Sequence, residues 1–285
     1  MINENNHGVS PVRHSKLYHK THRFLRTYIG KAGVPFDWSK GIVRPMYNIK
    51  NQYTSSSCWG QMFSRMIQII QGCEELSAKS AYSPIYVTGG GVNLPDGENE
   101  AKNIGLTTEK NVPSVFTLTN NQTCTEYFME DTSWRTLAMI RDSATRAGYD
   151  IVNIAIDVDS VAQAIRDYGT VGILLRGNNN GSWTSAYPKP PQGGGSLWGH
   201  YLAATGNIQP QLGTKWIPFY NSWGTDVGEK GIQYFNEIYF NSGFIIDVFT
   251  FQKKQVYQSD DPIWWKNFLN LLRWLRNNQT KVVTK

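Results

Sequence analysis

The run Gln52-Tyr-Thr-Ser-Ser-Ser-Cys58-Trp59 determines how we interpret this chain of 285 residues. It places an amide side chain six residues before a cysteine, and the cysteine opens an apolar segment with helical period. The unpaired N–H groups at a helix N-terminus stabilise negative charge, so a cysteine there is suited to ionise. An amide one short loop upstream is suited to donate a hydrogen bond to an oxyanion. The run therefore predicts Cys58 as a nucleophile with Gln52 beside it.

A base for this cysteine has one main candidate among the five histidines of the chain. The other four, which lie in a polar and basic stretch, are His7, His14, His19 and His22. His200 lies instead in an apolar, strand-like run over residues 197–206. A lone buried histidine is more often a hydrogen-bonded core residue, and only the pairing with Cys58 favours a catalytic role for His200.

An asparagine follows at the end of a second strand-like run. Asn221 ends Pro218-Phe-Tyr-Asn221, and segment 207–215, rich in Gln, Pro and Gly, connects the two runs. An asparagine in this place can accept the N–H of an imidazole on the first strand and fix its tautomer. Taken alone, Asn221-Ser-Trp-Gly224 is equally well explained as a turn with an aromatic residue.

Together these three pieces resemble the papain-like cysteine proteases, in which a Cys followed by Trp or Tyr precedes the His and Asn by about 130–150 residues. Here His200 follows Cys58 by 142 residues and Asn221 follows it by 163. Other stretches similar to the family extend the resemblance from about Val34 to about Phe251. They are residues 34–38, 47–52, 89–91, 105–113 and 167–175.

The resemblance implies an α+β, papain-like fold with two lobes and the active-site cleft between them. The catalytic domain would span residues 34–252, with a helical lobe of about 51–130. A β-rich lobe resembling a barrel would span about 131–252, joined by the N-terminal segment that crosses to it. Residues 1–33 would form a basic arm before this domain, and residues 253–285 a tail after it.

The resemblance also implies roles for single residues. Cys58 would be the nucleophile, His200 the base and later the acid, and Asn221 the residue that orients His200. Gln52 would line the oxyanion hole together with the backbone N–H of Cys58. The residues that would contact substrate are Trp59, Gly89, Gly90, Gly91, Gly199, Tyr201 and Trp223, the last of which would also shield the His–Asn hydrogen bond from water. A thiolate–imidazolium pair would be the resting form, since the thiol pKa is roughly 3–4 in papain.

The chain departs from the family pattern in several places. Ser55 stands where the family has a structural cysteine, so the corresponding disulfide cannot form. Tyr201 stands where alanine is usual and would narrow a substrate pocket. Residues 132–148 have the pattern of an additional helix. This helix would either cover the core or dock a partner, and we favour the first. Cys73 and Cys124 either pair or remain thiols, and we favour thiols.

Positive charge is concentrated at the two ends of the chain. Residues 1–33 and residues 253–285 each carry a balance of +5, which leaves −4 for the rest of a total of +6. A helix with an apolar face is predicted over 263–276, with three tryptophans and flanking arginines. It would pack on its own domain, bind a protein partner, or lie on an anionic membrane surface. Specific nucleic acid binding is not predicted.

Other chemistries find little support in the sequence. The body has a single histidine and no paired cysteines, so no metal site and no cofactor are predicted. The N-terminus has no apolar signal-peptide region and no 18-residue apolar run occurs, so we expect a cytoplasmic or virion-associated protein.

The predicted activity is that of a cysteine endopeptidase acting on polypeptides through an acyl-thioester on Cys58. Two alternatives remain open at this point. One is a catalytically silent structural or binding protein of the same fold. The other is a cell-wall peptidase that uses the same Cys–His chemistry.

Overall fold

The computed structural model describes residues 34–87, 90–117, 123–130, 136–178, 182–193 and 197–254. The chain divides into two units, Met1–Gln252 and Lys253–Lys285. The basic arm 1–33 and the predicted helix 263–276 lie outside the described residues, so the roles given to them stay predictions. The description below concerns the first unit and strand β6, which ends at Lys253.

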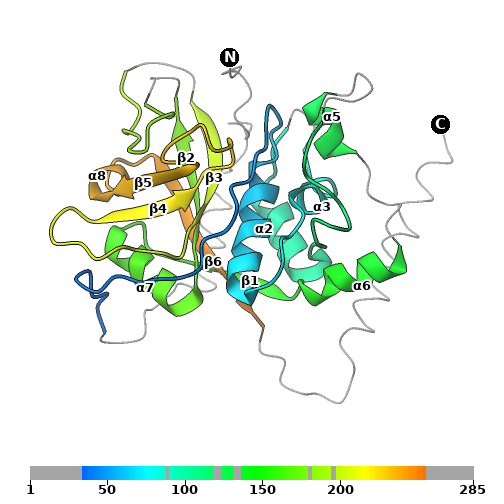
Figure 1. Ribbon diagram of the computed structural model, residues 1–285, viewed down its shortest axis with the longest axis horizontal. Coiled ribbons are helices and arrows are strands. Elements are labelled where there is room, and N and C mark those ends of the chain that lie inside the picture. The colour runs from blue at the N-terminus through cyan, green and yellow to red at the C-terminus, as the bar shows by residue number, and fades with distance from the viewer. Residues whose placement is uncertain are drawn as a thin grey trace. The chain divides into compact units, whose positions relative to one another are not determined.

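Helices and strands alternate unevenly along the chain (Figure 1). The helices are α2 (Cys58–Gln71), α3 (Ala78–Tyr82), α4 (Leu94–Asn99), the π-helix η1 (Glu100–Ile104), α5 (Cys124–Met129), α6 (Leu137–Thr145), α7 (Val158–Tyr168) and α8 (Glu237–Phe240). The strands are β1 (Tyr149–Asn153), β2 (Gly172–Gly177), β3 (Trp198–Ala204), β4 (Trp216–Tyr220), β5 (Ile232–Asn236) and β6 (Ile245–Lys253). The helices of the first half and the strands of the second confirm the predicted α+β class.

The strands form one six-stranded sheet in the order β1-β6-β2-β3-β4-β5. β3 pairs antiparallel with β2 and with β4, in registers that place Leu175 opposite His200 and Ala203 opposite Tyr220. Because side chains alternate between the faces of a strand, β3 contributes to two separate cores. Leu202 belongs to one of them and Tyr201 to the other.

The two cores lie on opposite faces of this sheet. One contains Ile165 of α7 and the alternate strand residues Ile173 and Phe219. The other contains most of α2 together with Tyr201 and Phe249, and α2 packs against β3 (Figure 1). The sheet therefore contributes to both cores, and one face of β3 forms part of the surface against which α2 packs.

Helix α2 begins at Cys58, as the sequence predicted, and ends before Gly72, whose φ of 60° gives the left-handed conformation that terminates helices. Its apolar face contributes to the core of the helical lobe. A second face carries Gln61, Arg65 and Gln68, which are also buried. The spacing of four and then three residues places these three polar side chains on one side of the helix.

Helix α6 lies within the additional helix predicted over 132–148. It packs on η1, and Asp142 accepts a hydrogen bond from the hydroxyl of Thr107 at 2.6 Å. Gly105 (φ 70°) permits this approach, because a Cβ there would lie 2.1 Å from the carbonyl oxygen of Ser143. The bounds predicted for the two lobes stay a prediction.

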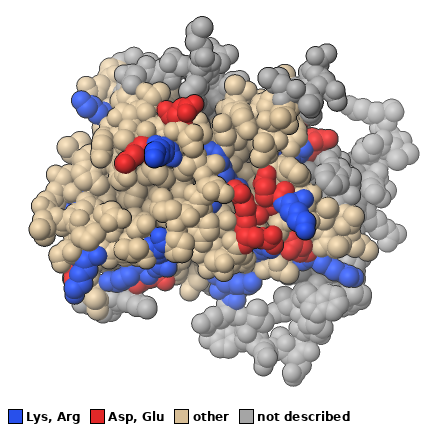
Figure 2. Space-filling model, viewed as in Figure 1, with Lys and Arg blue, Asp and Glu red and all other residues tan. Residues whose placement is uncertain are grey.

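Charge on the described surface is unevenly placed. Figure 2 shows acidic side chains gathered over the region where Figure 1 places α2 and α3, in keeping with the negative balance of this part of the chain. Among the described residues, no group of three or more His, Cys, Asp or Glu side chains gathers as metal ligands do. The helices in this part of the chain are all too short or too polar to span a bilayer.

The contact between α2 and α3 yields a first prediction. A Cβ on Gly60 would lie 2.3 Å from the carbonyl oxygen of Ala78, a backbone atom that cannot move aside. Gly60→Ala should therefore destabilise the protein by about 1–3 kcal/mol, the usual cost of overpacking. Helix propensity alone predicts the opposite, a gain of up to about 1 kcal/mol. Urea unfolding measures the sign, and unchanged or increased stability would contradict the close packing of α2 and α3.

Candidate active site

Cys58 is the first residue of α2 and is fully buried. The backbone N–H groups of Tyr201, Trp59 and Cys58 itself lie near the sulfur and favour the thiolate, which lowers the pKa of the thiol. Burial is the larger effect and raises the pKa of the Cys58 thiol to about 12. In this closed arrangement Cys58 is thus a neutral thiol, in contrast to the thiolate that the family resemblance implies. The physical reason is loss of water around the sulfur, which outweighs the helix N-terminus.

His200 lies on β3 and Asn221 directly follows β4. The antiparallel pairing of these strands brings the two side chains together, and His200 Nε2 lies 3.1 Å from Asn221 Oδ1. Both residues are buried. The hydrogen bond predicted between His200 and Asn221, which lie 21 positions apart, is therefore present.

Helix α2 packs against β3, the strand that carries the imidazole. Tyr201 directly follows His200 on β3, and its backbone N–H lies close enough to the Cys58 sulfur to lower the pKa of the thiol. Cys58 therefore lies against the stretch of β3 that contains His200, and Asn221 is hydrogen-bonded to His200.

Aromatic rings enclose the imidazole of His200. The ring of Trp223 stacks on it, with centroids 4.8 Å apart and an interplanar angle of 29°. Trp198 approaches the imidazole edge-on at 6.3 Å, and Trp183 packs against both indoles at 4.7 and 6.0 Å. These rings keep water from the His200–Asn221 hydrogen bond, and a low local dielectric strengthens such a bond.

Gln52 is held at both ends of its buried amide. Its Oε1 accepts from Ser222 Oγ at 2.6 Å and its Nε2 donates to the carbonyl of Ser55 at 2.8 Å. Its backbone N–H donates to the carbonyl of Ser222 at 2.7 Å. Because Ser222 follows Asn221, Gln52 is anchored to the turn that carries the orienting asparagine.

The serine that replaces a family cysteine stabilises the same loop by hydrogen bonds. Ser55 Oγ donates to the carbonyl of Gln52 at 2.6 Å and lies 2.7 Å from Ser57 Oγ. Cys124 Sγ donates to that carbonyl at 3.4 Å. All three cysteines are thiols. Cys73 and Cys124 therefore form no disulfide with each other, which is the alternative that we favoured from the sequence.

The residues predicted to contact substrate occupy different environments. Trp59 and Tyr201 are buried in the core of the helical lobe, edge to face at 5.1 Å. Gly90 lies against the loop before the cysteine, since a Cβ there would be 2.6 Å from Ser56 Oγ. Gly91 donates its N–H to the hydroxyl of Tyr82 at 3.2 Å. Gly199 pairs with Arg176 across β2 and β3, and Gly89 lies outside the described residues. Their role in substrate binding stays a prediction.

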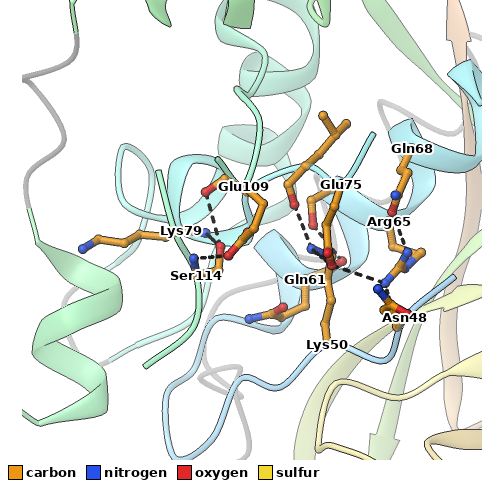
Figure 3. A network of polar contacts seen from close by, with 12 residues as sticks. Asn48, Lys50, Gln61, Arg65, Gln68, Glu75, Lys79, Glu109 and Ser114 are labelled. Atoms are coloured by element: carbon orange, nitrogen blue, oxygen red, sulfur yellow. Dashed lines mark hydrogen bonds and ion pairs between the residues drawn. The ribbon is translucent and has the colours of Figure 1, made fainter. Parts of the chain in front are cut away.

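A buried polar network lies behind the site, on the second face of α2 (Figure 3). Lys50 Nζ donates to the carbonyl of Leu76 at 2.7 Å and lies 3.4 Å from Glu75. Arg65 donates to Gln68 and to the carbonyl of Asn48, and its guanidinium lies over the ring of Tyr220 at 4.9 Å. Burial, and then the charge of Arg65, lower the pKa of Lys50 to about 8.

A small cavity connects this network to the site. Its volume of about 10 Å³ matches a single water molecule. The side chains around it come from α2, from the segment that crosses between the lobes and from β3 and β4. They are Lys50, Gln61, Met62, Arg65, Tyr201, Ala203, Tyr220, Asn221 and Ser222. Lys50 and Arg65 therefore line the same small cavity as Asn221.

Sequence reasoning missed several of these polar residues. Lys50 stands two residues before Gln52, and Arg65 interrupts the apolar helical period after Cys58, so each carried a detectable signal. Gln233 lies on β5 in the alternation phase of the core residue Phe235, which marks it as an inward polar residue. Asn221 Nδ2 donates to Gln233 Oε1 at 2.8 Å. Arg65 and Gln233 are polar side chains at positions that the helical and strand periods assign to the core, and this is the signal that could have found them.

Known proteins were compared with this chain at the levels of sequence and structure. No family model and no curated protein matches the sequence. Xylellain, a cysteine protease from Xylella fastidiosa, shares the fold with a TM-score of 0.67 and 15% identity, over 90% of this chain and 98% of its own. Digestive procathepsin L 3 of Tenebrio molitor larval midgut has a TM-score of 0.56 and 16% identity, over 80% and 73%. Bromelain from Ananas comosus has a TM-score of 0.50 and 19% identity, over 77% and 99%. The chain thus has the two-lobed papain-like fold that the sequence predicted.

The buried lysine yields a prediction for the pH dependence of stability. In the unfolded chain Lys50 keeps its proton up to a pKa of 10.5, whereas in the folded protein it loses it near 8. Between these values the unfolded state binds more protons, so the lysine makes stability rise with pH. The free energy of unfolding of wild type relative to Lys50→Met should increase by about 2–3 kcal/mol from pH 7 to pH 10.

Urea unfolding at several pH values measures this difference. Lys40→Met, which removes a lysine that is 82% exposed at its side chain, controls for a general effect of losing one positive charge. A constant difference between wild type and Lys50→Met across this range would show that Lys50 is not desolvated as the structure has it.

Proposed function

We propose that this chain is a cysteine peptidase that hydrolyses peptide bonds through an acyl-thioester on Cys58. The observation that carries the proposal is the placement of Cys58 at the start of α2, which packs against β3, together with the bond between His200 Nε2 on β3 and Asn221 Oδ1 at 3.1 Å. The shared fold with cysteine proteases supports it at the level of architecture.

The proposed reaction begins with proton transfer from the Cys58 thiol to Nδ1 of His200, the ring nitrogen that does not face Asn221. The sulfur attacks the peptide carbonyl carbon, and the oxyanion accepts hydrogen bonds from the Cys58 backbone N–H and from the second N–H of the Gln52 amide. The C–N bond then breaks, and the imidazolium gives its proton to the leaving amine. Water, activated by His200, hydrolyses the thioester and restores the thiol.

The rigidity of the Gln52 amide supports its part in this reaction. Ser222 and Ser55 hold the oxygen and one N–H of the amide, so the group is preorganised before any charge develops. An oxyanion donor that needs no reorganisation typically contributes about 10²–10³ in kcat.

One observation favours a second candidate, a catalytically silent protein of the same fold. Cys58 is fully buried and its pKa is raised to about 12, so the arrangement described is not poised to react. In the proposal we favour, entry of substrate or water into the cleft removes the main cause of this shift, which is burial. The three N–H groups on the sulfur then favour the thiolate.

The rate of labelling by the inhibitor E64, which is bound in the bromelain structure, separates the two candidates. We expect E64 to modify Cys58 faster in the folded protein than in the chain unfolded by urea, because only the folded site activates the sulfur. Mass spectrometry locates the adduct. Labelling no faster than in the unfolded chain would favour the silent protein.

Hydrolysis of denatured protein substrate tests the nucleophile. Cys58→Ala should lower kcat/KM by at least about 10⁴-fold, as loss of a nucleophile does in comparable enzymes. Cys73→Ala is the matched control and should keep wild-type turnover, because Cys73 lies beside Arg146, apart from the groups of the site. Near-wild-type turnover of Cys58→Ala would refute the assignment.

A further inference from the structure

We propose that Gln233 is a positioning residue for the His200–Asn221 pair. It determines which end of the Asn221 amide faces the imidazole, and through it which ring nitrogen of His200 holds the proton. The expected effect on turnover rests on the proposed function, whereas the effect on the imidazole is measurable without any substrate.

The orientation of Gln233 follows from its partners. Its Nε2 donates to the carbonyl of Trp183 at 2.6 Å and to the carbonyl of Ser185 at 3.1 Å. A backbone carbonyl can only accept, so both N–H groups of the amide are committed to these two oxygens. The other end of the amide, Oε1, is therefore the end that faces Asn221.

This orientation fixes the next amide in turn. Oε1 of Gln233 can only accept, so the group 2.8 Å from it must be the Nδ2 of Asn221. Asn221 then presents its Oδ1 to His200, where Nε2 lies at 3.1 Å. Because a carbonyl oxygen accepts, Nε2 must carry the proton, and the neutral ring keeps its lone pair on Nδ1. That nitrogen is the one that the proposed reaction uses as a base.

An amide turned by 180° would have the opposite result. Asn221 would then offer an N–H to Nε2, and His200 would have to accept at Nε2 and hold its proton on Nδ1. A base with its lone pair directed at Asn221 cannot take the proton of Cys58. The chain from Gln233 to His200 therefore selects the productive tautomer.

The start of this chain is rigid. Gln233 is fully buried on β5, where it pairs with Phe219 of β4. The segment that supplies the two carbonyls is bound to its surroundings by the backbone, through Gly228 N–H on Thr184 O at 2.9 Å and Tyr234 N–H on Ala186 O at 2.8 Å. The carbonyls of this segment therefore have fixed positions relative to the strand that carries Gln233.

The test combines a tautomer measurement with kinetics. Long-range ¹H–¹⁵N NMR of protein labelled at histidine, with a His200→Gln spectrum for assignment, should show His200 protonated at Nε2 in the neutral wild type. In Gln233→Met, which has similar volume but no group to accept from Asn221, the Nε2–H form should lose its dominance. kcat should fall by about 10–100-fold, the usual effect of removing such an outer partner, with little change in KM.

Two further variants separate positioning from stability. Gln233→Glu keeps an acceptor for Asn221 but cannot donate to the two carbonyls when ionised, so it should restore the Nε2–H form only in part. Phe235→Leu lies on the same face of β5 and packs on Trp183 at 6.0 Å. It should lower stability while leaving the tautomer and kcat unchanged.

The wild-type spectrum alone can overturn the proposal, if His200 is protonated at Nδ1. An unchanged tautomer and kcat in Gln233→Met would overturn it as well. A changed tautomer in a protein that cleaves no peptide supports the positioning role and refutes the proposed function, so the two failures are distinguishable.

Discussion

The packing of α2 on β3 is the constraint on which the arrangement of the candidate site depends. It brings Cys58, the first residue of α2, against Tyr201 in the middle of β3, next to His200. The edge-to-face contact of Trp59 with Tyr201 stabilises the same packing. Cys58 is therefore positioned by the contact between α2 and the sheet and not by a local loop alone.

Buried polar groups lie near this contact, and their hydrogen-bond partners include backbone carbonyls of the loop residues Asn48, Leu76 and Trp183. Tryptophans enclose the imidazole, and Gln233 accepts a hydrogen bond from Asn221. Lys50 and Arg65 also lie in the interior, where Glu75 lies 3.4 Å from Lys50 and 4.0 Å from Arg65. Such groups cost stability unless they are fully hydrogen-bonded.

Much of this structure could be predicted from the sequence because strong local signals coincide with it. The helix start at Cys58 and the adjacent strands of His200 and Asn221 follow from periodicity and turn residues. Three features could not be predicted. Burial of Cys58 depends on how closely α2 meets the sheet, α6 packs on η1 through a tertiary contact at Gly105, and the amide of Gln233 is oriented by carbonyls about fifty positions away. Gln233 itself leaves a local signal as an inward polar residue, but its distant partners do not.

The loop before Cys58 is closed entirely by non-covalent bonds. Ser55, Ser57 and the thiol of Cys124 converge on it, and the Gln52 carbonyl accepts from two of them. A papain relative that relies on a cystine at this point risks losing its catalytic loop when a reductant opens the bridge. Here there is no such bridge to open, so the hydrogen bonds around Gln52 do not depend on whether a cystine is oxidised or reduced.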